Sequence, residues 1–187
     1  MPIEKSIACL LATLGASALS MSALAADTLK VGMVLPMSGP FAAYGKQIEH
    51  GARLYLQQSG GSFAGRKVEL IVKDDTGIAP EISKRAAQEL VVKDKVDVLA
   101  GFGLTPSALA AAAIATEAKK PMVVMNAAAS VITTKSNYIL RVSHTLPQIT
   151  APIAGWAAKN RIKRVYTLVA DYGPGHDAEA QFKKTFA

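Results

Sequence analysis

Cysteine and histidine are scarce in this sequence of 187 residues, which contains one cysteine and three histidines. The cysteine, Cys9, lies in an apolar segment near the N-terminus, so a chain cleaved behind that segment would have no thiol. Such a chain can form no disulfide, no cysteine-ligated metal site and no cysteine nucleophile. His50, His144 and His176 do not have the spacing of metal ligands, and no His-Glu-x-x-His motif is present. We expect no metal site and no cofactor.

Catalytic signatures are also missing. The Gly-x-Ser-x-Gly motif is absent. Asp74 and Asp75 could form an acid pair, but adjacent side chains at a strand end usually diverge, which favours a role in a turn or cap. The GFG sequence at 101–103 lacks the rest of a dinucleotide fingerprint, because Pro106 takes the place of its last glycine. We expect no catalytic residue and a protein that is not an enzyme.

Basic residues outnumber acidic ones and give a net charge of +7, but they are spread along the chain. The densest groups, at 159–164 and 183–184, are short and contain no stripe of interleaved aromatic residues. Nucleic-acid binding is therefore not expected. The hydrophobic fraction of 50% is ample for a packed core.

The N-terminal 25 residues have the pattern of a secretory signal. Lys5 precedes an apolar run at 7–14, and Ala23-Leu24-Ala25 fits the cleavage rule of small residues at alternate positions. A retained membrane anchor is the alternative, but the run is short and interrupted by polar residues. Cys9 lies too early for a lipoprotein. We expect a signal peptide over 1–25 and an exported mature chain.

After the signal, apolar runs of strand length alternate with segments of helical periodicity, which predicts a doubly wound parallel α/β sheet. The predicted strands are 29–36, 68–72, 96–100, 122–125 and 138–142, and the predicted helices are 43–58, 80–92 and 106–119. A further helix at 147–160, a strand at 165–169 and a helix at 176–186 follow.

The later elements read as a second unit. We predict a first, incomplete lobe over 26–142, and over 143–187 a hinge crossing with the start of a second lobe. One strand and two helices cannot bury a core alone, so the chain is expected to be part of a larger protein.

In an open α/β sheet, ligands bind outside the carboxyl ends of the strands, and four loops qualify here. They are 37–45, 101–107, 126–130 and 170–175. The loop at 101–107 opens a helix, where free N–H groups and the Thr105 hydroxyl could hold an anion; alternatively, Thr105 is simply the N-cap before Pro106. The loop at 126–130 consists of small residues that let a ligand approach the backbone, or it is an ordinary turn. Tyr44 and Tyr172 are candidate aromatic walls or packing residues.

Several motifs agree in order with one family. The segments MSGPFAAYG, KDDTG, AGFG, PMVVMNAAAS, YILRVS and VADYG resemble periplasmic binding proteins of the branched-chain amino acid (leucine/isoleucine/valine) type, which are substrate-binding components of ABC importers. The resemblance runs from about residue 27 to the end and implies a type I clamshell of two lobes, in a protein about twice this length.

The resemblance also implies the site. Family members hold the ligand's α-carboxylate and amine with a hydroxyl residue and main-chain groups, and the matching positions here are Thr105 and the Asn126-Ala127-Ala128 turn. Two tyrosines of the family's site match Tyr44 and Tyr172. A disulfide that some members carry near positions 76 and 104 is absent.

A threonine common in the third loop of the family is Ala128 here, which removes a hydroxyl that would help to fix an amine. An aromatic carboxylate therefore suits this chain somewhat better than an amino acid. We expect a monomeric periplasmic receptor that binds a small carboxylate and delivers it to an ABC permease. The alternatives are a sensor domain of the same fold and, with least support, an exported enzyme.

Overall fold

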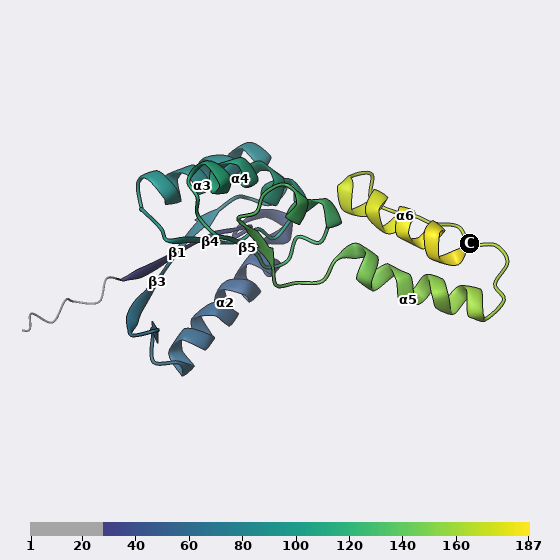
Figure 1. Ribbon diagram of the computed structural model, residues 1–187, viewed down its shortest axis with the longest axis horizontal. Coiled ribbons are helices and arrows are strands. Elements are labelled where there is room, and N and C mark those ends of the chain that lie inside the picture. The colour runs from purple at the N-terminus through teal and green to yellow at the C-terminus, as the bar shows by residue number, and fades with distance from the viewer. Residues whose placement is uncertain (1–27) are drawn as a thin grey trace, which may run out of the picture.

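The computed structural model describes residues 28–187, so the predicted signal peptide at 1–25 lies outside the described residues (Figure 1). Six strands form a sheet in the order β2-β3-β1-β4-β5-β6. Neighbouring strands are parallel except β2, which pairs with β3 in an antiparallel hairpin. The strands are β1 (Leu29–Leu35), β2 (Ser62–Phe63), β3 (Arg66–Asp74), β4 (Val98–Gly101), β5 (Met122–Val124) and β6 (Ile139–Arg141).

Helices cover both faces of this sheet, with α3 and α4 on one face and α2 on the other (Figure 1). This confirms the predicted doubly wound α/β fold. The helical elements are η1 (Gly39–Phe41), α2 (Ala42–Gln58), α3 (Pro80–Val92), α4 (Thr105–Glu117), η2 (Ser130–Thr134), α5 (Leu146–Lys159) and α6 (Gly173–Phe186). Within residues 28–187, none of the helices has the length and apolar character needed to span a bilayer.

β1 lies at the centre of the core, and its side chains alternate between the two faces. Met33 and Leu35 are almost fully buried in the cluster that contains Ile48 and Ala52 of α2. Val34, also fully buried, belongs to the larger cluster on the α3 and α4 face. Each such side chain contributes about 1.5–3 kcal/mol by leaving water. The near-continuous apolar sequence of β1 thus reflects burial on both faces.

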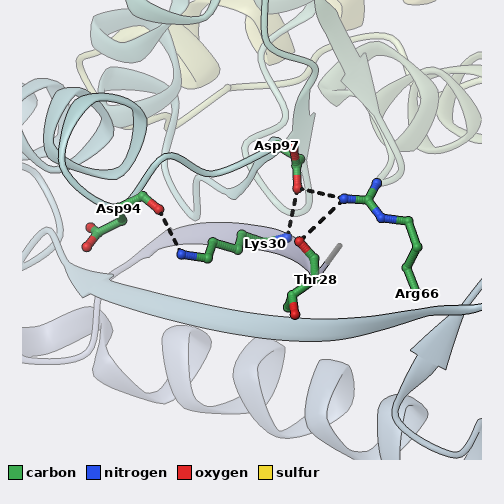
Figure 2. A network of polar contacts seen from close by, with 5 residues as sticks. All are labelled: Thr28, Lys30, Arg66, Asp94 and Asp97. Carbon is green, nitrogen blue, oxygen red and sulfur yellow. Dashed lines mark hydrogen bonds and ion pairs between the residues drawn. The ribbon is translucent and has the colours of Figure 1, made fainter. Parts of the chain in front are cut away.

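A polar network ties the amino ends of the strands together (Figure 2). The Lys30 backbone N–H donates to Asp97 Oδ2 at 3.0 Å, and the Lys30 ammonium donates to the Asp94 carbonyl at 3.4 Å. The Arg66 guanidinium lies 3.5 Å from Asp97 Oδ2 and donates to the Thr28 carbonyl. The network joins β1, β3 and the turn before β4. It lies at the amino ends of the strands, whereas a ligand is expected at their carboxyl ends.

α5 and α6 pack on each other and lie beside the sheet rather than on it (Figure 1). We call residues 28–142 the sheet unit and residues 146–186 the helical hairpin. The helical hairpin contains the segment 165–169, which was predicted to be a strand, and that prediction is wrong. The segment has no strand pairing, and Tyr166 and Leu168 are 93% and 94% exposed. A strand needs a neighbour for its N–H and C=O groups, and no described segment supplies one.

Smaller differences concern element ends. α4 begins at Thr105 and α6 at Gly173, each earlier than predicted, and β4 begins two residues later, at Val98. The short strand β2 was not predicted because two exposed residues carry no apolar pattern. The division into lobes at 142 and 143 stays a prediction.

Candidate functional site

A cavity of about 380 Å³ opens at the carboxyl ends of the parallel strands. Without β2, the parallel strands stand in the order β3-β1-β4-β5-β6. The chain adds β3 on one side of β1 and then β4, β5 and β6 on the other side, so the strand order reverses between β1 and β4. Ligands of this fold class bind at such a reversal. All six residues predicted from the sequence line this one cavity. Its lining consists of Phe41, Tyr44, Gly103, Leu104, Thr105, Asn126, Ala127, Ala128, His144, Leu146, Tyr172 and Pro174.

Thr105 provides a buried hydroxyl without a partner. The N-cap of α4 is Leu104, so the alternative prediction that Thr105 is the N-cap is wrong. Thr105 is the first residue of the helix, is 4% exposed, and its Oγ1 has no hydrogen-bond partner within the described chain. An unpaired buried hydroxyl costs about 1–3 kcal/mol, and the positive end of the helix dipole lies beside it. The position is therefore suited to a negatively charged group.

The turn at 126–128 divides its polar groups between the fold and the cavity. The Asn126 side chain donates to the Gly103 carbonyl at 2.8 Å, which braces this turn against the loop that carries Thr105. The Ala127 N–H donates to the Phe102 carbonyl at 3.1 Å. The backbone N–H groups of Asn126 and Ala128, by contrast, have no acceptor among residues 28–187. The turn thus offers these two N–H groups as free donors to a ligand.

Phe102 fixes these loops relative to one another. Its side chain is fully buried and its φ of +59° turns the chain sharply out of β4. Its N–H donates to the Val34 carbonyl at 2.7 Å, while its carbonyl accepts from Ala127. A left-handed backbone at a non-glycine residue is uncommon and is tolerated where the surroundings impose it. These bonds join the turn after β4 to β1 on one side and to the turn at 126–128 after β5 on the other.

An aromatic pair forms the wall contributed by the first loop. The rings of Phe41 and Tyr44 stack with centroids 6.2 Å apart and planes inclined by 18°. Tyr44 is 48% exposed, so its ring and hydroxyl stay accessible from the cavity side. Stacked aromatic rings offer an apolar surface of fixed orientation, which a flat ligand can use.

Asp74 shapes the start of that loop. Its Oδ1 accepts hydrogen bonds from the backbone N–H groups of Met37, Ser38 and Thr76. Burial alone would raise the pKa of Asp74, but the hydrogen bonds from Ser38, Thr76 and Met37 outweigh it and lower the pKa below its ordinary value.

Asp75 points the other way and is 1% exposed, where it accepts from the Gly77 N–H at 3.0 Å and the Ser83 hydroxyl at 3.1 Å. Both carboxylates serve turns, as the sequence favoured over an acid pair.

The helical hairpin supplies the far wall. Tyr172 is the N-cap of α6, and Pro174 lies in the first turn of that helix. His144, in the connection before α5, and Leu146, the first residue of α5, also line the cavity. Phe41, His144, Leu146 and Pro174 were not among the site residues predicted from the sequence. Phe41 and Pro174 lie inside loops that were identified, whereas nothing in the sequence distinguishes His144 from a histidine on a solvated surface.

The arrangement provides a hydroxyl, free backbone N–H groups, a helix N-terminus and aromatic rings, which together can bind a small anion with an apolar body. Within the described part of the chain, no group of three or more histidine, cysteine or acidic residues could hold a metal ion.

Comparison with known proteins agrees with this geometry. Residues 28–187 match the family model described as "Periplasmic binding protein". The chain is 46% identical over 176 residues to "Leu/Ile/Val-binding protein homolog 6" of Brucella abortus (strain 2308), a match that covers 94% of this chain and 45% of the relative. The chain thus spans just under half the length of the curated relatives it matches.

Solved structures give the same result. The solute binding protein of an ABC transporter from Rhodopseudomonas palustris BisB5, in complex with 3,4-dihydroxybenzoic acid, is 55% identical with a TM-score of 0.82, covering 85% of this chain and 44% of that one. A solute binding protein from Rhodopseudomonas palustris HaA2, in complex with p-hydroxybenzoic acid, is 49% identical with a TM-score of 0.83, covering 86% and 44%. The motifs, the fold and these matches together show that the chain belongs to the periplasmic binding protein family.

Proposed function

We propose that this chain is the ligand-binding part of an extracytoplasmic receptor that supplies an ABC importer, and that its ligand is a small aromatic carboxylate. The observation that carries the proposal is the Thr105 hydroxyl, buried and without a partner at the N-terminus of α4 inside the cavity. A fold that leaves such a group unpaired recovers its cost when a ligand pairs with it. A carboxylate matches both the hydroxyl and the helix dipole.

The remaining lining favours an aromatic body over an amino acid. Recognition of an α-amine needs acceptors, and the methyl group of Ala128 offers none at the position where the resemblance to the branched-chain amino acid family implies a threonine hydroxyl. The stacked Phe41 and Tyr44 rings present a flat apolar wall, and Tyr172 and His144 add polar tips that can pair with ring hydroxyls. The Rhodopseudomonas proteins with dihydroxybenzoic and hydroxybenzoic acid support this choice.

The cellular setting follows from the same proposal. The predicted signal peptide over 1–25 would export the chain to the periplasm, where it would act as a monomer and meet its permease at the membrane. Binding requires no covalent step, so the receptor would not be an enzyme. Closure of the helical hairpin over the ligand would produce the form that the permease distinguishes from the empty receptor.

The test is a binding measurement on the mature protein that carries this chain, together with whatever coding sequence follows Ala187. Isothermal titration would compare 3,4-dihydroxybenzoate, 4-hydroxybenzoate and benzoate with leucine, isoleucine and valine. We expect the aromatic acids to bind at least tenfold more tightly than the amino acids, and benzyl alcohol, which lacks the carboxylate, not to bind.

A preference for leucine would overturn the aromatic proposal while keeping the receptor. A folded protein that binds none of the six ligands would overturn the receptor proposal itself. Incubation of each bound ligand with the protein, followed by chromatography, should return it unchanged, and a product would show an enzyme.

A further inference from the structure

A pair of hydrogen bonds joins the helical hairpin to the sheet unit outside the cavity. Asp177 on α6 accepts from the Ser130 backbone N–H through Oδ2 and from the Ser130 hydroxyl through Oδ1, both at 2.8 Å. The two residues are 47 positions apart in the chain. Neither lines the cavity. The carboxylate therefore connects two units that bracket the ligand without touching the ligand site.

The sheet-unit side of this contact is firmly anchored. Ser130 begins η2 and is itself exposed, while Ala129 before it and Ile132 in the same turn are 2% and 0% exposed. The guanidinium of Arg141, on β6, donates to the Ala129 carbonyl. Burial lowers the pKa of Arg141, and the negative charge of Asp177 opposes that effect. The backbone next to the Ser130 donors is thus tied to β6 through Arg141.

The other side of the contact carries cavity residues. Asp177 lies in α6 five residues after Tyr172 and three after Pro174, and both of these line the cavity. Gly173, between them, lies against Thr105, because a Cβ at Gly173 would be 3.9 Å from Thr105 Cγ2. Any rotation of α6 away from η2 would move Tyr172 and Pro174 off the cavity.

We propose that the Asp177–Ser130 pair is a latch that holds Tyr172 and Pro174 over the ligand and thereby sets how long the ligand stays bound. Asp177 is a positioning residue, since it acts through α6. The inference rests on the proposed function, because it needs a ligand in the cavity.

For a ligand that binds only the closed form, the apparent Kd equals the intrinsic Kd divided by the fraction of molecules that are closed. Loss of the latch lowers that fraction and should raise the Kd. Because the bound ligand leaves when Tyr172 and Pro174 move off the cavity, we expect the change mainly in the dissociation rate.

The experiment compares four variants of the mature protein with 4-hydroxybenzoate as the probe. Asp177→Ala removes both hydrogen bonds, and Ser130→Ala removes only the one to the hydroxyl. Asp177→Asn keeps an oxygen acceptor for the Ser130 N–H and an amide donor for its hydroxyl, so it should restore much of the binding. Glu179→Ala is the matched control, since Glu179 lies on the same helix but pairs only with Thr167 and Lys183 inside the helical hairpin.

We expect Asp177→Ala to raise the Kd and the dissociation rate about five- to tenfold, because the lost bonds are charge-assisted but partly exposed. Ser130→Ala should raise both by a smaller factor, and Glu179→Ala by less than twofold. The ratio between the Kd values for 4-hydroxybenzoate and benzoate should be the same in every variant, since the latch does not touch the ligand. The melting temperature without ligand should stay within a degree of the parent protein.

Several results would overturn the latch. One is an Asp177→Ala protein that releases 4-hydroxybenzoate at the parent rate. Another is a loss of affinity that Asp177→Asn does not restore and that follows a lower melting temperature without ligand, which would mark Asp177 as merely structural. Should Asp177→Ala fail to fold, an unchanged dissociation rate in Ser130→Ala would decide against the latch. A parent protein that binds no carboxylate refutes the proposed function instead, and that result is seen before any variant is made.

Discussion

Replacing Thr105 with valine should change stability and binding in opposite directions. Valine has nearly the shape of threonine but no hydroxyl, so the substitution tests the single atom on which the carboxylate proposal depends. In the protein without ligand, Oγ1 is buried and unpaired. Its removal takes away a desolvated polar group and breaks no hydrogen bond.

The magnitudes follow from that asymmetry. Relief of an unpaired buried hydroxyl should stabilise the unliganded protein by about 1 kcal/mol, which raises the melting temperature by about 2–4 °C for a domain of this size. A bound carboxylate, however, would lose a hydrogen bond to a charged group, worth about 2 kcal/mol. The Kd should therefore rise roughly thirtyfold.

Two measurements on the same samples check this prediction. Calorimetric melting without ligand gives the stability, and isothermal titration with 4-hydroxybenzoate gives the Kd. Thr105→Ser is the matched control, because it keeps the hydroxyl and should bind within a few-fold of the parent protein. A valine variant that binds as tightly as the parent would remove Thr105 from the site, and one that melts at a lower temperature would show that its hydroxyl has a partner after all.

Three further predictions concern the frame of the site. A Cβ at Gly45 would lie 2.2 Å from the carbonyl oxygen of Pro36, just after β1, so Gly45→Ala should lower the free energy of unfolding by about 1–3 kcal/mol or more. Gly51 lies in the same helix with nothing within 4 Å of such a Cβ, so Gly51→Ala should instead raise the free energy of unfolding by about 0.5–1 kcal/mol. Equal urea midpoints for the two variants would refute the steric reasoning.

Asp75→Ala leaves the Gly77 N–H unpaired in the core and removes one of the two acceptors of the Ser83 hydroxyl, whose other acceptor is the Ala79 carbonyl. The substitution should cost about 1–3 kcal/mol in urea unfolding, and a loss below about 0.5 kcal/mol would contradict this. Because the pKa of Asp74 is lowered in the folded protein, the stability that its carboxylate contributes is complete above the ordinary pKa of 3.8 and is lost as the pH falls through the lower folded value. The parent protein should therefore lose stability below about pH 4 more steeply than Asp74→Asn. Parallel stability curves for the two proteins from pH 3 to 6 would argue against this.

Most of the fold could be predicted because its signals are local. The five parallel strands are apolar runs between turn residues, and helical periodicity marks α2, α3 and α4. The segment 165–169 shows where such reasoning stops. Its apolar residues have strand propensity, but a strand exists only with a hydrogen-bonded neighbour, and a neighbour is a property of the whole fold. Tyr166 and Leu168 accordingly lie in no strand and are exposed.

The candidate site was predictable at the level of loops. Parallel strands bring their carboxyl ends to one edge, so the residues after 36, 101 and 125 had to meet there, and Tyr44, Thr105 and the turn at 126–128 do line one cavity. Contacts between distant segments carry no such rule. His144 and the pairing of Ser130 with Asp177 depend on how the helical hairpin packs against the sheet unit, and no pattern in the sequence encodes that packing.

Some polar groups at the candidate site form hydrogen bonds within the fold, and others have no partner there. Only the second kind is available to a ligand. The Asn126 side chain and the Ala127 N–H are consumed in joining loops, so substitutions there should disturb the frame before they disturb recognition. The Thr105 hydroxyl and the N–H groups of Asn126 and Ala128 have no partner in the part of the chain that the structure describes. The buried Thr105 hydroxyl is costly without a partner, and under the proposed function a carboxylate would accept charge-assisted hydrogen bonds from it and from the N–H groups of the turn. The proposed selectivity for an acid would then depend on donors that the fold itself does not use.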